Sequence, residues 1–531
     1  MIQCVPTKTA TAARLSNPWL FVPLLYFMQA IPVTVVQEVA TVFYKDMGIL
    51  NEPITRWTSL IALPWSLQIL LGPLVDLNFT KRLWIIGGQF LCALGIIATA
   101  FVLKVPHAFE ISLVILGATA VLSALCNIAT DGFYLIALSK DQQAKFVGVQ
   151  STCYRLGRLF CVGILVQVAG KLAHGGMDQI TAWAVTIGAG GGIYLLGHLV
   201  NRIAVPQPVS DQPAAAQAPG ETRRNLARTL SVVGMGLGGY FALSAVVRLS
   251  AHAFWMGIGE KLKGWMLPAT SDLLGLQLPG VVAEVVQLAL AGGIAAFCFV
   301  LAKRTIANTS MGDAFGSFFR QPKIVPIFFF ILFYRFGEAM VSKMSPLFLK
   351  DSLVNGGLAI PNDQLGVVKG YFGVLGIVAG GLCGAWMVSR LGLKKAFLPL
   401  ALAMHIPNLL YLLLATTKIP LAYVSLGYFG DVPMTLVGVD FVDQFGYGFG
   451  FAAYMVYIMY VAQRGHYKTA HYAIGSGSGA LCIAVAGIVS GIIQSNFGYA
   501  AFFVSVILLS LPGLITLFFI PFDDVQTESS Q

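Results

Sequence analysis

Long runs of apolar residues recur along most of the chain, separated by short polar segments. A run of about 20 apolar residues can cross the hydrocarbon core of a bilayer as a helix. Fourteen such runs fall into groups of six, two and six, which predicts an all-α membrane protein built from two similar halves. The predicted spans are 18–44, 57–76, 83–103, 110–138, 145–170, 180–204, 229–257, 279–302, 324–349, 364–389, 395–416, 436–462, 469–495 and 499–521.

Two segments interrupt this pattern. Residues 206–228 are rich in Pro, Ala and Gln and have no periodicity, which is typical of a flexible linker. Residues 305–323 are short and amphipathic, so they either lie at the cytoplasmic interface or simply connect two helices. The predicted division is therefore an N-terminal six-helix half (1–205), the linker, two additional helices (229–304), the interfacial segment, and a C-terminal half with its tail (324–531).

Composition and charge agree with a membrane protein. Apolar residues make up 57% of the chain and charged residues 11%, whereas soluble proteins carry about 25% charged residues. This composition excludes a soluble enzyme, a secreted disulfide scaffold and a disordered chain. The eight cysteines show no metal-ligand spacing, so we interpret them as packing residues. No cleavable signal peptide is visible, and we expect the first helix to remain as an anchor.

The net charge of +10 follows from membrane topology rather than from a nucleic-acid partner. If the N-terminus is cytoplasmic, nineteen Lys and Arg residues fall on the cytoplasmic side and nine on the other, with Lys369 counted among the nine. Cytoplasmic loops of membrane proteins carry an excess of Lys and Arg. The distribution predicts that both termini are cytoplasmic.

The two six-helix groups share an internal repeat. The first predicted helix ends in Phe43-Tyr44-Lys45-Asp46, and the ninth ends in Phe348-Leu349-Lys350-Asp351. Each half also has a basic turn between its second and third helices, at Lys81-Arg82 and at 390–395. Two halves of matching organisation indicate a transporter with a solute site between them, near the membrane midplane.

Charged residues inside the predicted spans are the candidates for function. A charge at the bilayer centre costs roughly 2.5–3.5 kcal/mol on insertion scales, so each needs a partner or a role. The spans contain Glu38, Asp131, Arg155, Arg158, Arg248, Glu284, Arg335, Glu338, Lys343, Asp440 and Asp443.

Two pairs of these charges are each spaced three residues apart, and this spacing suggests their roles. Arg155 and Arg158 lie three residues apart, on one helical face, and could hold an anionic or hydroxyl-rich solute or pair internally with Asp131. Arg335 and Glu338 have the same spacing and either neutralise each other or form a polar rim in a cavity.

The acidic residues of the twelfth helix have two interpretations. Asp443 could load a proton, because burial raises the pKa of a carboxylate, or it could cap a helix N-terminus near the interface. We expect Asp440 to be structural. On the two middle helices, we expect Arg248 and Glu284 to be peripheral.

Glu38 and Lys343 occupy equivalent positions, because each precedes its Phe-x-Lys-Asp ending by five residues. We hypothesise that they form an ion pair between the halves that closes the non-cytoplasmic gate in the inward-facing state. The alternative is that each charge extends toward the interface by itself.

Several segments together resemble one family. They are the segment from Leu63 to Asp76, the helix around Asp131, Tyr154-Arg155-Leu156-Gly157, Tyr334-Arg335-Phe336-Gly337-Glu338 and Phe441-Val442-Asp443-Gln444-Phe445. The chain resembles the AmpG-type muropeptide permeases, in the peptide–acetyl-coenzyme A transporter group of the major facilitator superfamily. Members of this group also carry two extra helices between the halves.

The resemblance implies the major facilitator fold and proton-coupled import of anhydromuramyl sugars or muropeptides across the bacterial inner membrane. It implies that the central cavity or its coupling network is lined by Asp131, Tyr154, Arg155, Arg335, Glu338 and Asp443. We add as candidate solute-binding or coupling residues Gln29, Gln68, Asn127, Arg158 and Gln444, and as a candidate cytoplasmic motif Gly72, Asp76, Lys81 and Arg82. The expected partners are the bilayer, a small solute and protons, with no cofactor, no metal and no nucleic acid, and the expected state is a monomer.

The chain departs from this family at two positions. The family usually has a Lys where this chain has Gln68, and a Gln-Asp pair where it has Cys126-Asn127. We interpret this as an ion pair replaced by hydrogen bonding. The alternatives are a transporter of another solute, such as a peptide, a coenzyme A ester, a siderophore or a drug, and a transport-inactive sensor. A membrane enzyme is disfavoured, because no catalytic constellation is present.

Overall fold

The structure is a computed structural model, and it describes residues 17–522 except 69–70, 73–74, 76–78, 209–210, 212–220, 259–269, 274–275, 307–309, 418 and 466. It is helical apart from two short hairpins, which the sequence did not predict. One hairpin pairs β1 (Thr270–Leu273) with β2 (Leu276–Pro279), and the other pairs β3 (Tyr423–Ser425) with β4 (Asp431–Pro433).

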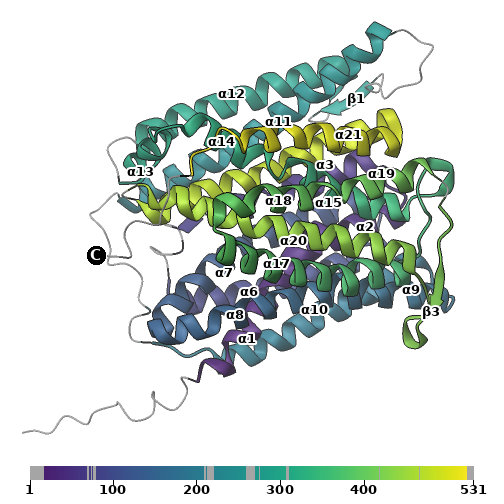
Figure 1. The fold of residues 1–531 in the computed structure, drawn as a ribbon, viewed down its shortest axis with the longest axis horizontal. Coiled ribbons are helices and arrows are strands. Elements are labelled where there is room, and N and C mark those ends of the chain that lie inside the picture. The colour runs from purple at the N-terminus through teal and green to yellow at the C-terminus, as the bar shows by residue number, and fades with distance from the viewer. Residues whose placement is uncertain are drawn as a thin grey trace, which may run out of the picture.

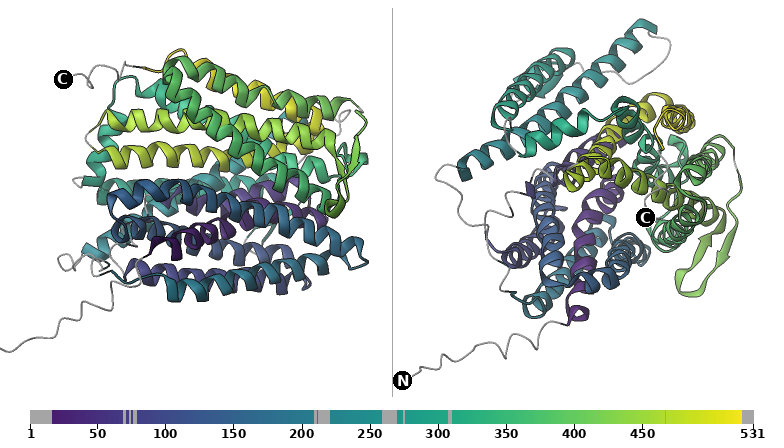
Figure 2. Two further views of the ribbon diagram at one scale, coloured as in Figure 1. Left: turned by 60° about the horizontal axis from the view of Figure 1, so that its bottom comes forward. Right: turned by 60° about the vertical axis from the view of Figure 1, so that its left-hand side comes forward.

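The helices form two bundles and an additional pair (Figures 1 and 2). The N-terminal half contains α1 (Val22–Thr34), α2 (Ala40–Asp46), α3 (Asn51–Ile61), α4 (Leu63–Ser66), α6 (Lys81–Val102), α7 (Ala108–Ala137), α8 (Lys140–Leu159), α9 (Val166–His174) and α10 (Gln179–Ala204). The C-terminal half contains α14 (Ile324–Phe333), α15 (Phe336–Lys350), α16 (Asn362–Leu365), α17 (Gly373–Leu391), α18 (Leu393–His405), α19 (Asn408–Thr416), α20 (Met434–Gln463) and α21 (Lys468–Thr516). Between them lie α11 (Glu221–Ile258), α12 (Gly280–Ile306) and the short α13 (Ser310–Phe319).

Among the described residues, 12 helices are long and apolar enough to cross a membrane. The chain is therefore a multi-pass membrane protein, but this count differs from the predicted fourteen. One reason is that α21 joins two predicted spans: its 49 residues run through a kink at Gly498, which has a φ of 77° that favours glycine. The other reason is that the predicted span 57–76 is represented by α3 and α4 and then runs outside the described residues.

The two ends of the molecule have different structures. We call the end where α1 begins the terminal end (left in Figure 1) and the opposite end, where α2 finishes at Asp46, the distal end. One apolar cluster joins both halves, through residues such as Val39 and Phe43 with Phe348 and Leu365. Two further clusters each belong to one half: one centres on Phe133, and the other extends from α13 to the end of α21. The halves therefore share a large core toward the distal end, and a smaller fourth cluster joins Leu63 of the N-terminal half to Ile488 and Ile492 of α21.

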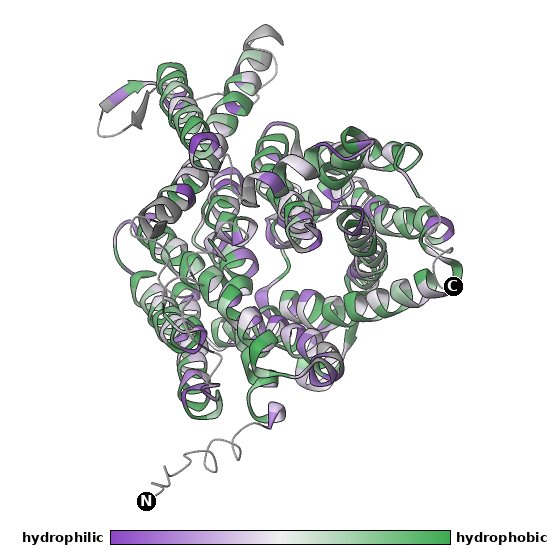
Figure 3. Cartoon of the chain, turned by 90° about the vertical axis from the view of Figure 1, so that its left-hand side faces the viewer, coloured by the Kyte–Doolittle hydropathy of each residue, from purple (hydrophilic) through white to green (hydrophobic). Residues whose placement is uncertain are grey.

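Apolar residues predominate along most helices, as the hydropathy colours of Figure 3 show in a view from the terminal end, and many of them have exposed side chains. Phe101, Leu196, Leu382 and Phe518 are examples, with more than 60% of their surface exposed. Apolar surface on this scale is typical of contact with lipid.

Three π-helical segments interrupt the α-helices near the contact between the halves. They are η3 (Val35–Val39), η4 (Phe160–Leu165) and η6 (Gly366–Phe372). The first follows Pro32, which lacks the N–H that a regular helix needs and therefore disturbs the hydrogen-bond pattern. Segments of this kind occur frequently at functional sites.

Candidate functional site between the halves

Two reciprocal ion pairs join the halves at the distal end. The ammonium of Lys45 lies 2.9 Å from the carboxylate of Asp351, and the ammonium of Lys350 lies 2.6 Å from that of Asp46. Each half therefore supplies one cation and one anion, both from the end of its repeated Phe-x-Lys-Asp motif. All four side chains are largely buried. We call these four residues the distal clasp.

Further hydrogen bonds surround Asp46. Its carboxylate accepts bonds from Trp183 at 2.7 Å and Gln179 at 3.1 Å in the same half, and from Asn362 of the other half at 2.7 Å. The charge is thus compensated by donors from both halves, which stabilises a buried carboxylate.

Asp351 has a similar environment. It accepts bonds from Asn51 of the other half at 3.3 Å, and from Tyr499 and Asn355 at 2.9 Å each. Burial acts to raise the pKa of Asp351, but the bonds from Asn355 and Lys45 outweigh it, so the pKa lies below its usual value.

The predicted gate pair is not formed. Glu38 accepts two bonds from Arg158, at 2.8 and 3.0 Å, which is a pair within the N-terminal half. Lys343 is 95% buried, and its ammonium has no hydrogen-bond partner among the described residues. The ion pairs that do join the halves lie seven and eight positions further along each helix, at Lys45 with Asp351 and at Lys350 with Asp46, where the distal ends of α2 and α15 meet.

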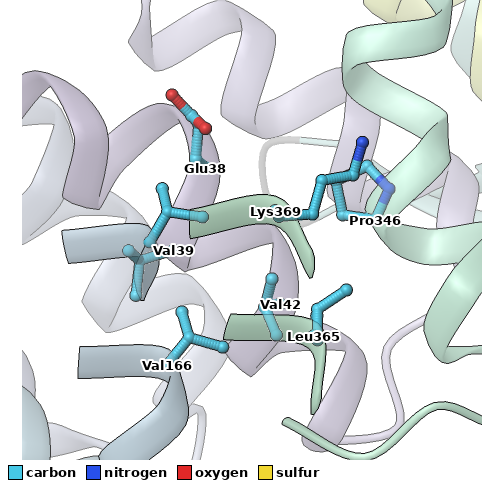
Figure 4. Close-up of a pocket in the computed structure, with 8 residues that line it drawn as sticks. Glu38, Val39, Val42, Val166, Pro346, Leu365 and Lys369 are labelled. Carbon is cyan, nitrogen blue, oxygen red and sulfur yellow. The ribbon is translucent and has the colours of Figure 1, made fainter. Parts of the chain in front are cut away.

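A small pocket lies between the distal clasp and the middle of the spans (Figure 4). Its walls are mainly aliphatic, with Val39, Val42, Val162, Val166, Pro346 and Leu365 from both halves, and Glu38 and Lys369 complete it. Figure 4 shows the charged ends of these two side chains turned away from the aliphatic ones. Because a helix rises 1.5 Å per residue, the distance from Glu38 to Lys45 corresponds to an apolar layer about 10 Å thick.

Close approach of two backbones seals this layer. The segments η4 and η6 cross at Gly163 and Gly370, where a side chain on Gly370 would collide with the backbone of the other segment. A hydrogen bond of 3.2 Å from Tyr371 to Gln167 lies beside this crossing.

The C-terminal half holds a buried cluster of acidic residues. Lys369 is 2.5 Å from Asp440 and also donates to Ser345 and Tyr411. Asp443 accepts a bond from Gln444 at 3.1 Å, but its second oxygen has no partner in the described part of the chain. The capping interpretation of Asp443 is not supported, because it is the tenth residue of α20.

Glu338 and Arg335 do not form the expected ion pair among the described residues. Glu338 is 98% buried, has one oxygen without a partner, and interacts electrostatically with Asp443. Arg335 instead donates to the hydroxyl of Tyr447 at 2.8 Å, and its guanidinium lies 4.7 Å from the ring centre of Phe451. Cations are attracted to the faces of aromatic rings at such distances.

In the N-terminal half, Asp131 bonds to a tyrosine rather than to an arginine. Tyr26 donates to it at 3.1 Å and accepts a bond from Gln150 at 2.9 Å. Arg155 has a buried nitrogen without a partner in the described residues. Its Nη2 would lie 3.4 Å from a Cβ atom placed on Gly381, so the guanidinium lies close to the backbone of the other half. A pair between Arg155 and Asp131 is not observed in the described residues, and solute binding by Arg155 stays a prediction.

The remaining predicted site residues are less informative. Gln29, Gln68 and Tyr154 are partly buried and Asn127 is buried. One buried oxygen of Gln29 has no partner among the described residues. In the part of the chain that the structure describes, no hydrogen bond to Gln68 or Asn127 is observed, so their proposed hydrogen bonding stays a prediction.

The cytoplasmic motif is only partly described. Asp76 lies outside the described residues, and Gly72 is partly buried. Arg82 donates to the carbonyls of Arg202 and Val205 at the end of α10, while Asp211 accepts bonds from the backbone N–H groups of Lys81 and Arg82. Asp211 belongs to the predicted flexible linker, and it is 97% buried.

Two groups of functional residues were not predicted. The distal clasp was visible as a repeat, but its charges were counted only as topology signals. Lys369 was placed outside the membrane, although it lies in the helical span Asn362–Leu391. In the described residues there is no group of three or more His, Cys, Asp or Glu side chains that could hold a metal ion.

Comparisons with known proteins give a transporter fold and a limited sequence likeness. No family model matches the chain. "Putative transporter AmpG 4" of Rickettsia felis is 23% identical over 209 residues, which is 39% of this chain and 46% of that protein. "Putative transporter AmpG 1" of Rickettsia bellii is 23% identical over 194 residues, 36% of this chain and 43% of that protein. The match thus spans less than half the length of these relatives, and it supports a divergent AmpG-type permease.

Solved structures of transporters match over nearly the whole chain. A mutant of the nucleoside transporter NupG has a TM-score of 0.54 and 12% identity, covering 94% of this chain and 98% of that one. A mutant of the peptide transporter POT in complex with sulfate has a TM-score of 0.57 and 14% identity, covering 93% of each chain. This likeness shows that the chain has the fold of these transporters.

Proposed function

We propose that the protein is a proton-coupled secondary transporter that imports cell-wall-derived anhydromuramyl sugars or muropeptides across the bacterial inner membrane. In this proposal it has fourteen membrane-spanning helices and cytoplasmic termini, so the distal end faces the periplasm. The single observation that carries transport is the asymmetry of the interface: clasp, shared core and glycine crossing close the distal end, while the cluster around Phe133 and the cluster from α13 to the end of α21 each stay within one half.

Alternating access explains this asymmetry. A transporter that rocks its halves around a central site must close one end while the other is open. The described conformation would then be the one open to the cytoplasm, and the distal clasp would have to break before solute could enter from the periplasm.

The unpartnered charges supply a solute site and a proton site in this proposal. Arg155 and Lys343 come from opposite halves and would hold an anionic group of the solute, with Arg335 and its aromatic neighbours beside it. Asp443 and Glu338 would carry the proton. Two interacting carboxylates in a buried site cannot both stay ionised without large cost, so one binds a proton readily.

Uptake into proteoliposomes tests the function. We expect accumulation of an anhydromuramyl peptide only with a proton gradient, and Asp443→Asn should abolish the stimulation by the gradient while exchange without a gradient continues. Glu110→Gln, which alters an exposed acidic residue at the start of α7, is the matched control. Uptake that ignores the gradient would contradict coupling.

The substrate is tested separately in the same vesicles. Flux of a peptide, a coenzyme A ester or a siderophore, without flux of any cell-wall fragment, would favour the alternative function. The alternative keeps the same fold and the same conformational cycle, and its support is the peptide transporter among the structural neighbours. Absence of flux for all solutes would favour a sensor.

A further inference from the structure

The additional helix α11 touches both halves at the same place. Tyr240 is 95% buried, in a cluster with Leu63 of the N-terminal half and with Ala484, Ile488 and Ile492 of α21. Its hydroxyl donates a hydrogen bond of 2.5 Å to the backbone carbonyl of Arg56 in α3. A single side chain therefore contacts both sides of the seam between α3 and α21.

Aromatic packing strengthens this attachment. Phe241 of α11 packs against the ring of Trp57 of α3, with 6.1 Å between the ring centres. Within the additional pair, Arg248 of α11 forms an ion pair with Glu284 of α12, and both side chains are largely buried. The additional pair is thus held together by an ion pair and attached to α3 by aromatic packing.

The attachment is continuous with the distal clasp. Asn51, next to Glu52 at the start of α3, donates to Asp351, to Gln494 at 2.9 Å and to Tyr499 at 2.8 Å. The last two acceptors lie on α21, the helix that α11 also contacts. The seam that α11 covers is therefore the same seam that the clasp closes.

We propose that the additional helix pair is a strap that stabilises the closed distal end. The contacts of Tyr240 with both halves exist together only while α3 and α21 are packed at the seam. An element that binds one of two states more tightly shifts the population toward that state. The proposal rests on the alternating access proposed above, and it assigns to α11 and α12 a role in setting the balance between the two states.

Labelling of a buried cysteine tests the strap without any transport assay. All eight cysteines are replaced, and Val42→Cys is introduced, because Val42 is 95% buried in the apolar layer below the clasp. A membrane-impermeant maleimide is added from the distal side of right-side-out vesicles. Tyr240→Ala removes the hydrogen bond to Arg56 and the packing of the tyrosine ring, and it should raise the labelling rate of the introduced thiol about three- to tenfold. Tyr240→Phe keeps the packing and should give a smaller increase.

Two controls make the outcomes distinct. Phe297→Ala alters a side chain of α12 that is 68% exposed, and it should leave the rate unchanged. Asp46→Asn with Asp351→Asn opens the clasp directly and should raise the rate in any case. If the clasp variant reacts faster and neither Tyr240 variant does, the strap is wrong and alternating access survives. If no variant reacts faster, the closed distal end is permanent, and both proposals are overturned.

Discussion

The distal clasp and the centre of the spans contain the same kinds of residues, but their charges are satisfied differently. At the clasp, Asp46 and Asp351 each accept several bonds, and each is paired with a lysine of the other half. At the centre, Lys343, Arg155 and Asp443 retain buried atoms without partners in the described residues.

The presence or absence of partners within the protein separates charges that stabilise a conformation from charges that are available to bind a ligand. A buried ion whose bonds are all made within the protein is part of the structure. A buried ion without a partner is costly, and it persists where a solute or proton supplies the missing interaction during the cycle. Variants at the centre should therefore impair transport more than they alter the conformational balance, and variants at the clasp should do the reverse.

The largest effect is expected at Arg335. Replacement by alanine removes the bond to Tyr447 and the contact with Phe451, and it should lower solute uptake about 100-fold, since loss of a buried charged contact costs about 2–5 kcal/mol. Arg390→Ala, at an exposed position near the end of α17, is the control. Normal uptake by a well-folded Arg335→Ala protein would show that this arginine is structural.

The next effect concerns the clasp. Asp46→Asn combined with Asp351→Asn removes both ion pairs, and we expect faster distal labelling and roughly tenfold slower uptake, because each charge-assisted bond contributes about 1.5–3 kcal/mol. Lys45→Asp with Asp351→Lys restores one pair in the reverse order and should recover part of the uptake. If the exchanged pair behaves like the neutral variant, attraction between these charges is not what closes the end.

A smaller and opposite pair of effects is expected for Lys343. Lys343→Met keeps the length of the side chain and removes a buried charge without a partner, so it should raise the melting temperature by a few degrees while lowering uptake. Thermal unfolding in detergent and uptake in vesicles measure the two effects. A drop in both would place Lys343 with the structural charges of the clasp.

The smallest effect is the pH dependence of the clasp near neutrality. Hydrogen bonds hold the pKa of Asp351 below its usual value, so its stabilising contribution is complete above that value and disappears as the pH falls through the lowered pKa. The rate of distal labelling, divided by the rate for a free thiol at the same pH because only the thiolate reacts, should be constant from pH 8 to pH 5 and rise only below about pH 3.9, the usual pKa of Asp. Opening at pH 6 would indicate a different titrating group.

Much of the fold was predictable, because spans of apolar residues are long and their lengths are set by the bilayer. The halves, the extra pair and the repeat all followed from the sequence. The break at Gly498 falls between the predicted spans 469–495 and 499–521. The hairpins were not predicted, since strands of three or four residues leave little pattern.

The site was harder to predict, because partners depend on how helices rotate against each other. Arg158 was expected near solute or Asp131, yet it bonds to Glu38 on η3, where the π-helical segment after Pro32 alters the regular helical pattern. Spacing along one helix also suggested that Arg335 pairs with Glu338. In the structure Arg335 bonds instead to Tyr447, more than a hundred residues away.

The reciprocity of the clasp also bears on the origin of the chain. A Lys-Asp sequence at the end of one helix complements itself when two copies meet across a two-fold axis, because the lysine of each copy faces the aspartate of the other. This is the geometry of a symmetric homodimer interface. Each half therefore contains both charges that are needed to close against a second copy of itself, which is the arrangement expected if the two halves arose by duplication.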